Sequence, residues 1–584
     1  MQAYQEKYIE NIKEIAALLD VARGGDPETE KIRRIEAKKK SEILRKENID
    51  LLNRNLFTCL DELHTVSEDA IKELEEFSDV LMDWTTNLDC GIYLLIHEAL
   101  LTLYRFRKDR NNIIKELYKV GMGLYYQNRS VQGVESPLTH SLYFEAEMMF
   151  SEASSYLKYF AEIPDEETKG YIIRSLANIA ICTHDLKKKV DISRKVLQIV
   201  QDPYYQELAP GLPWDVFLRR THQQMSSNRA VMSRGNLSAE ELASVLESCQ
   251  YVFEPEAHKG DPNVRWLWPY YEMEYSCGFV DIDTTLDRME KLISDADEKQ
   301  FDASAMYANC QLPIYYGTLL KRNQNIRNRK RRLDYLKDAY DKMMRVAMAY
   351  PVDDGIDYFS YLMTLIITDY YETSGVPSYK EITTKLIRKL SGVSYLRSLV
   401  AQKIASYLCE SILSEDPAFF DDIPFIGEEK DIQRKKELLC DYGENCALYY
   451  DFGLLKMNLE RLMRSRNLLE REYEIYQLHT VSGHDDLASR ESTEIYADCT
   501  YGHHAWYDGV NGYPAEYVRN ESVYRQMTDV IALVSYLVEA YDNDTTKNVK
   551  EIIQTEKKRF SPVLLAMLMD DEHMGKIQSL LEEQ

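Results

Sequence analysis

The sequence lacks the features that mark secreted and membrane-spanning proteins. Its ten cysteines are scattered and include no CxxC pair, which is typical of a cytoplasmic protein with reduced thiols. The N-terminus has no basic start followed by an apolar run, so no secretory signal is predicted. The most apolar stretch, residues 90–104, is broken by His97 and Glu98 and is too short to cross a bilayer.

Positive charge is also scarce. The chain carries 71 Lys and Arg against 97 Asp and Glu, a net charge of -26. A polymeric nucleic acid or an anionic membrane requires a positive surface, so neither is predicted as a partner. The one basic run, residues 321–332, is interpreted as a solvated helix face or loop.

What the sequence does contain is helical periodicity. No proline occurs from residue 28 to 136, and apolar residues recur at three- and four-residue intervals, as in IDLLNRNLFTCLDEL (49–63). No long segment shows the alternation of a β-strand. The predicted fold class is therefore all-α, and the length of 584 residues suggests about three domains.

The predicted organisation is an N-terminal helical region (1–115), a helical repeat-like region (116–375) and a C-terminal domain (379–584). Residues 170–200 are predicted to form two antiparallel helices with a short turn. Such pairs resemble tetratricopeptide-type repeats, but no clean period of about 34 residues is found, so a generic helical array is predicted. ETSGVPS (372–378) is predicted to be a linker.

Three short motifs near the C-terminus follow one another in order. They are YYDFG (449–453), HTVSG (479–483) and HHAWYDGVNGYP (503–514). Together with RFSPVLLAMLMD (559–570), they resemble the HD-GYP family, whose bacterial members hydrolyse cyclic di-GMP with a cluster of metal ions in an all-helical domain. The resemblance covers about 200 residues, from residue 379 to the end.

The resemblance implies that one metal ion is held by Asp451, His479, His503 and His504. Three imidazoles and one carboxylate suit iron, manganese or zinc. The resemblance also makes Gly512 and Tyr513, in the Gly-Tyr-Pro loop, candidate substrate-binding residues.

Other positions depart from the family pattern. Tyr450 stands where the family has the HD histidine, and Leu454 stands where it has a lysine. Ser535 occupies the position of a late aspartate, unless a shifted register puts Asp529 there. A phenol is a poor ligand at neutral pH because its ordinary pKa is about 10. The second metal position and part of the phosphate-binding charge are therefore predicted to be lost.

These observations predict a bacterial cytoplasmic signalling protein with a degenerate HD-GYP-like domain. It would hold at most one metal ion and not hydrolyse cyclic di-GMP. Its helical region would bind a protein partner or small ligand, with a cyclic dinucleotide as another candidate ligand. The oligomeric state is left open, with a homodimer as one candidate. Two alternatives remain open: an active phosphohydrolase with one metal ion and an altered substrate, and a helical scaffold whose histidines only pack in the core.

Overall fold

The computed structural model describes residues 1–584 except 24–30, 84–86, 130, 132–133, 135, 228–235, 261, 350–378, 391, 458, 555–556 and 583–584. Within the described residues the fold is all-α, as predicted, and strand-like pairing is limited to three isolated bridges. No helix of this described part combines the length and apolar character needed to cross a bilayer. The expected linker at 372–378 lies outside the described residues.

The first part of the chain is a series of antiparallel helices. They are α1 (Ala3–Arg23), α2 (Lys31–Leu51), α3 (Thr58–Asp61), α4 (Glu68–Leu81), α5 (Cys90–Arg107), α6 (Arg110–Arg129), α7 (Pro137–Ser155), α8 (Glu166–Cys182), α9 (Leu186–Gln201), α10 (Pro203–Leu208) and α11 (Trp214–Met225). The predicted helix pair at 170–200 is found as α8 and α9. The expected division after residue 115 falls inside α6, and residues on both sides of it share one apolar core.

The array continues through α13 (Ala239–Ala257), α14 (Val264–Ser276), α15 (Ile282–Asp295), α16 (Ala303–Met306), α17 (Leu312–Arg322) and α18 (Arg329–Ala349). The C-terminal helices are α20 (Tyr379–Leu390), α21 (Gly392–Glu415), α22 (Pro424–Gly427), α23 (Ile432–Tyr449), α24 (Glu460–Ser465), α25 (Glu470–Ala488), α26 (Glu494–Gly502), α27 (Arg525–Asn543), α28 (Val549–Gln554), α29 (Pro562–Leu568) and α30 (Asp571–Leu581).

Short polar residues fix where many helices begin. The side chains of Asp89, Asp165 and Asp431 accept backbone N–H groups at the starts of α5, α8 and α23. Ser238 and Glu241 form a reciprocal capping box at the start of α13. Each cap satisfies N–H groups that have no partner within the helix, and this helps to set the register in which its apolar face packs.

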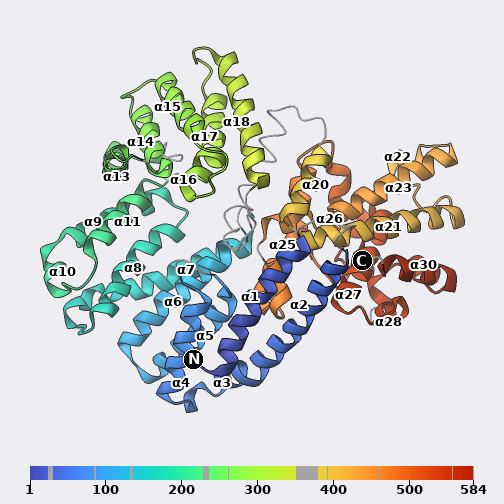
Figure 1. The fold of residues 1–584 in the computed structure, drawn as a ribbon, viewed down its shortest axis with the longest axis horizontal. Coiled ribbons are helices and arrows are strands. Elements are labelled where there is room, and N and C mark those ends of the chain that lie inside the picture. Colours follow the sequence, from blue (N-terminus) through green and yellow to red (C-terminus); the bar gives the residue numbers. More distant parts are fainter. Residues whose placement is uncertain are drawn as a thin grey trace.

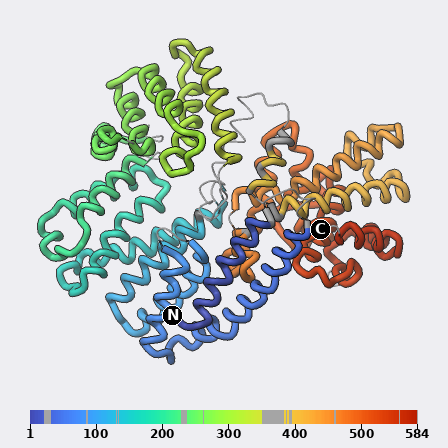
Figure 2. The backbone as a smooth tube through the Cα atoms, in the orientation of Figure 1, coloured from blue at the N-terminus to red at the C-terminus, as the bar shows by residue number. Residues whose placement is uncertain are grey.

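The array curves so that its first helices lie beside the C-terminal ones. Figures 1 and 2 show α1 and α2 lying beside the C-terminal helices. The largest apolar core runs from Tyr8 to Phe217 and also takes in Met457, Ile475 and Tyr476 of the C-terminal part. The N-terminal helices therefore form part of the surroundings of the C-terminal domain.

A buried ion cluster reinforces this junction. The guanidinium of Arg466 donates to Asp89 (2.6 and 2.7 Å) and to Glu472 (2.7 and 2.8 Å). The Tyr8 hydroxyl donates to Asp89 at 2.7 Å. All four side chains are buried, and they join α1, the start of α5 and the start of α25. We call them the Arg466 cluster.

The basic run at 321–332 is only partly a solvated face, so that expectation needs correction. Arg332 is buried and donates to Glu290 at 2.6 Å and to Asp287 at 2.8 Å. Arg327 pairs with Asp283 at 2.9 Å. Several of these cations therefore neutralise carboxylates of the same protein.

Candidate metal centre

The four residues predicted to hold a metal lie in three separate segments of the sequence. Asp451 lies two residues after the end of α23, His479 lies in the third turn of α25, and His503 and His504 follow the last residue of α26. His479 and His503 are fully buried, His504 is nearly so, and the Asp451 side chain is 12% exposed. The structure brings all four into one cluster, which we call the histidine cluster.

Two motif glycines make this convergence sterically feasible. A Cβ on Gly453 would overlap the carbonyl oxygen of His479, and a Cβ on Gly483 would lie 2.6 Å from the Thr500 side chain. Any larger residue would push the turn after α23 away from α25, or α25 away from α26. The glycines of YYDFG and HTVSG therefore allow the turn after α23, α25 and α26 to pack closely.

The nitrogen atoms have the spacing expected around a single ion. His479 Nε2 and His503 Nε2 are 3.3 Å apart. One ring nitrogen of each of the three histidines lies within 4.8 Å of the other two. Two ligands bound to one tetrahedral ion at 2.0–2.1 Å are separated by about 3.3 Å. Asp451 Oδ1 lies 3.6 Å from His479 Nε2 and 3.8 Å from His503 Nε2, so it is close to both of these nitrogens.

Backbone carbonyls fix the tautomers of two rings. His479 Nδ1 lies 2.6 Å from the Tyr476 carbonyl oxygen, and His503 Nδ1 lies 2.8 Å from that of Thr500. Because a carbonyl oxygen can only accept, each Nδ1 must carry the proton. In the neutral rings the two Nε2 lone pairs then face each other, an arrangement that an electrophile between them would stabilise. Histidine ligands of metals are commonly oriented in this way.

His504 is held by different contacts. Its ring stacks on Tyr513 at 4.5 Å between centroids, and Arg559 Nη2 lies 3.4 Å from its Nδ1. Gly512 has a φ of +87°, and a Cβ there would overlap the His504 carbonyl oxygen. The candidate substrate residues Gly512 and Tyr513 therefore both pack against His504.

Burial favours the neutral state of every member of the histidine cluster. It lowers the pKa of His479 to about 4 and those of His503 and His504 well below their usual range. Burial also raises the pKa of Asp451 to about 7, an effect that Arg397 opposes and Glu539 reinforces. Neutral imidazoles are the form that binds metal, whereas the carboxyl must first lose its proton.

The positions implied for a second metal do not add to this set. Tyr450 is buried beside His503, and burial raises its pKa well above the usual value, so the phenol stays protonated. Ser535 is buried and donates to the Ala532 carbonyl at 3.2 Å. Leu454 is a half-buried apolar residue packed against the large core.

Asp529 belongs to a separate arrangement. Its carboxylate accepts from Arg519 Nε at 2.7 Å and lines a small cavity with Trp506 and Arg559. Among the described residues, the metal-competent group, whose ligand atoms all lie within 4.8 Å of one another, consists of His479, His503 and His504. Asp451 lies outside this group but is close to the His479 and His503 rings, whereas Asp529 pairs with Arg519.

Glu539 was not predicted from the sequence. It lies one helical turn after Ser535 on α27, so both point toward the same side of that helix. Its charge raises the pKa values of Asp451, Tyr450 and Tyr476. The i+4 spacing places Glu539 on the same face of α27 as Ser535. The sequence alone, however, does not show that this face lies near Asp451.

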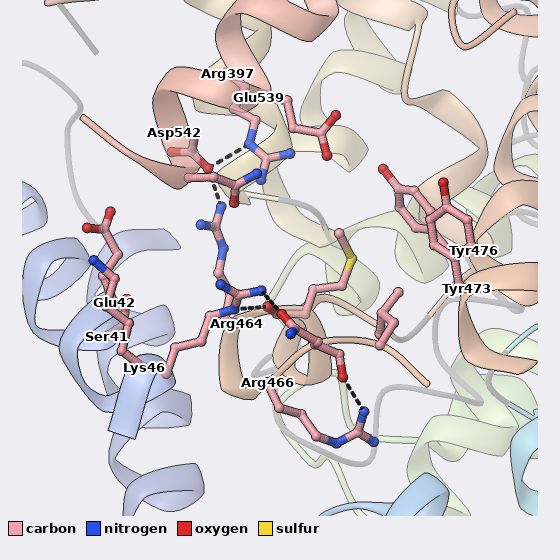
Figure 3. A pocket seen from close by; sticks show the side chains of 15 residues that line it. Ser41, Glu42, Lys46, Arg397, Arg464, Arg466, Tyr473, Tyr476, Glu539 and Asp542 are labelled. Atoms are coloured by element: carbon pink, nitrogen blue, oxygen red, sulfur yellow. Dashed lines mark hydrogen bonds and ion pairs between the residues drawn. The ribbon is translucent and has the colours of Figure 1, made fainter. Parts of the chain in front are cut away.

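A cleft adjoins the histidine cluster beyond Tyr476, whose ring lies 4.7 Å from that of His479. The cleft has a volume of 230 Å³ and is lined by residues from both ends of the chain. Figure 3 shows Glu42 and Lys46 of α2 at the left of the cleft and Arg397, Glu539 and Asp542 at the top. Helix α2 thus forms one wall of the space next to the site.

Asp542 ties this wall together. Its carboxylate accepts from Lys38 of α2 at 2.5 Å, from Arg464 at 2.6 Å and from Arg397 at 2.9 Å (the two arginine contacts are drawn in Figure 3). The three cations hold the pKa of Asp542 well below its usual range despite the opposing effect of burial. Arg397, which also acts on Asp451, is therefore fixed by a residue that binds the N-terminal region.

Comparisons with protein-family models, curated proteins and solved structures find no match to this chain.

Proposed function

We propose that this chain is a bacterial cytoplasmic regulatory protein with a degenerate HD-GYP-like domain that binds one iron, manganese or zinc ion. The ligands are Asp451, His479, His503 and His504. The observation that carries the proposal is that these residues, far apart in sequence, meet with two imidazole lone pairs facing each other at 3.3 Å. An ion there would act as a Lewis acid.

The same geometry supports a role other than cyclic di-GMP hydrolysis. Two-metal hydrolysis requires ions about 3.5–4 Å apart that share the attacking and leaving oxygens. Tyr450 and Ser535 offer a protonated phenol and a hydroxyl bonded to its own helix instead of ligands. The regulatory output would come from the helical region, which shares a core and the Asp542 ion pairs with the C-terminal domain.

The test is the metal content of the full chain, purified without oxygen or chelator. About one iron, manganese or zinc per chain is expected in the wild type, and none in a His503→Ala, His504→Ala double variant, because two of the four ligands are lost. His484→Ala is the matched control, since this half-buried histidine lies outside the metal-competent group. Two ions per chain, or equal metal in all three proteins, would contradict the proposal.

A second candidate function is a phosphohydrolase with one metal ion and an altered substrate. The cleft beyond Tyr476 favours it, because Arg397 and Lys46 line a space next to the histidine cluster. The metal-loaded chain should be assayed on cyclic di-GMP and on simple phosphodiesters. Turnover that disappears in the double variant and persists in His484→Ala would establish the enzyme; no turnover supports the regulatory role.

A further inference from the structure

The helical array contains a second cavity, far along the chain from the histidine cluster. It has a volume of 480 Å³ and is formed by side chains of α6, α8, α9, α11 and α14. These helices follow one another along the array in Figure 1. We call it the array groove.

The charge of the array groove is opposite to that of the protein. Four basic residues line it, Arg174, Lys189, Arg220 and Arg265, and no acidic side chain is found among the described lining residues. The whole chain carries 26 more acidic than basic residues. A local concentration of cations in such a protein attracts an anionic ligand to this place.

Two of these arginines have no carboxylate partner among the described residues. Arg174 lies over the rings of Tyr171 and Phe217, at 5.4 and 5.9 Å, and Arg265 lies over that of Trp266 at 5.0 Å. A guanidinium stacked on an aromatic ring keeps its in-plane N–H groups available for a carboxylate. Elsewhere in the array, arginines such as Arg288 and Arg332 are paired with glutamates.

The remaining lining groups suit a polypeptide. Gln223 carries a donor and an acceptor in one amide, so it can pair with a peptide bond. Phe217 and Trp266 offer apolar surface for a side chain of the ligand. A cavity built from five helices accommodates an extended segment, as the binding surfaces of helical arrays commonly do.

We propose that the array groove binds an acidic peptide segment of a partner protein, with its carboxylates on the four basic residues and an apolar side chain on the aromatic surface. A nucleic acid or a membrane would extend beyond the four cations onto an acidic protein, where it would be repelled. A short segment places its few charges within the groove. This proposal does not depend on the metal site.

The experiment is a selection of displayed random peptides on the full-length wild-type chain. Enriched sequences should be rich in Asp and Glu with an aromatic or aliphatic residue, and their synthetic, fluorescently labelled forms should bind less tightly as salt is raised. Enrichment of neutral or basic peptides, or no enrichment, would overturn the proposal.

Neighbouring arginines on α11 provide a matched pair of variants for the binding assay. Arg220 lines the groove, whereas Arg219 does not, and both are exposed. Arg220→Glu should weaken binding of a selected peptide at least tenfold, and Arg219→Glu less than threefold, with the helical circular dichroism of both unchanged. Equal effects would place the peptide elsewhere. Displacement of the peptide by a cyclic dinucleotide, sensitive to Arg220→Glu, would show a small-ligand site and also overturn the proposal.

Discussion

Two clusters of buried polar side chains lie on α25, one around Glu472 in its first turn and one around His479 two turns later. In the Arg466 cluster every charge meets an opposite charge, and Tyr8 supplies a further hydrogen bond. In the histidine cluster the rings and carboxyl are neutral at moderately acidic pH, and two lone pairs face each other.

The two clusters differ in whether the protein's own side chains satisfy their polar groups. Arg466 holds the pKa of Asp89 below its usual value even though burial alone would raise it, so this cluster keeps its charges and needs no ligand. In the histidine cluster two acceptor nitrogens face each other at 3.3 Å, and neither carries a proton that the other could accept. Removing one partner from a charge-paired buried cluster destabilises the fold, whereas facing acceptor nitrogens are suited to binding a cation.

Breaking the Arg466 cluster should produce the largest effect. Arg466→Ala leaves Asp89 and Glu472 buried without their partner, and we expect a loss of about 3–5 kcal/mol in the free energy of unfolding. Urea unfolding of the full chain measures it. The control is Arg471→Ala, because Arg471 is one-third exposed and its contacts with Glu98 and Glu145 are 3.4 and 3.3 Å. That variant should lose less than about 1 kcal/mol; similar losses in the two variants would contradict the assignment.

Metal binding to the histidine cluster should produce the next largest effect on stability. Saturating zinc or manganese, at about one hundred times its Kd, should stabilise the chain by about 2.7 kcal/mol, because the ion binds the folded site. The Tm of chelator-treated protein should therefore rise when metal is returned. His479→Ala should show no such rise, whereas Arg471→Ala should respond like the wild type. A rise of equal size in His479→Ala would place the ion elsewhere.

The smallest effect is the dependence of metal affinity on pH. The metal-free carboxyl of Asp451, with its pKa raised to about 7, must lose a proton before it binds an ion. Below pH 7 the metal affinity should therefore fall by up to about tenfold, or 1.4 kcal/mol, for each pH unit, and above pH 7 it should level off. The buried His479 stays neutral down to its pKa of about 4, so it adds no slope in this range.

Competition with a chelator at several pH values measures this dependence. Asp451→Asn should bind more weakly but lose the slope between pH 5 and 7. A slope of two or more protons per ion would show that histidines also titrate there, and would contradict the assignment to Asp451.

Much of the fold and part of the site could be predicted from the sequence. Helical periodicity identifies the all-α class, and the resemblance of three short motifs to the HD-GYP family implies the set Asp451, His479, His503 and His504, which the structure brings together. Local spacing also identifies the glycines that let the motifs approach. The role of Gly453 in the packing against His479, however, becomes evident only when the two turns are seen together.

Contacts between distant segments could not be predicted in this way. Asp89 and Arg466 are 377 residues apart, and nothing in either neighbourhood names the other. The same holds for Lys38 and Asp542, which bring α2 to the edge of the cleft. The array groove was also missed, because its four basic residues are spread over four helices and no linear run of charge marks them.

The separation between Asp89 and Arg466 has a consequence for synthesis of the protein. A ribosome adds about 5–20 residues per second, so Arg466 is made about 20–75 seconds after Asp89. During that interval α1 and α5 cannot pack against the C-terminal part of the chain. Arg466, which neutralises Asp89, and the apolar residues Ile475 and Tyr476 have not yet been synthesised. The N-terminal helices must therefore be kept from aggregation or proteolysis until nearly the whole chain has been translated.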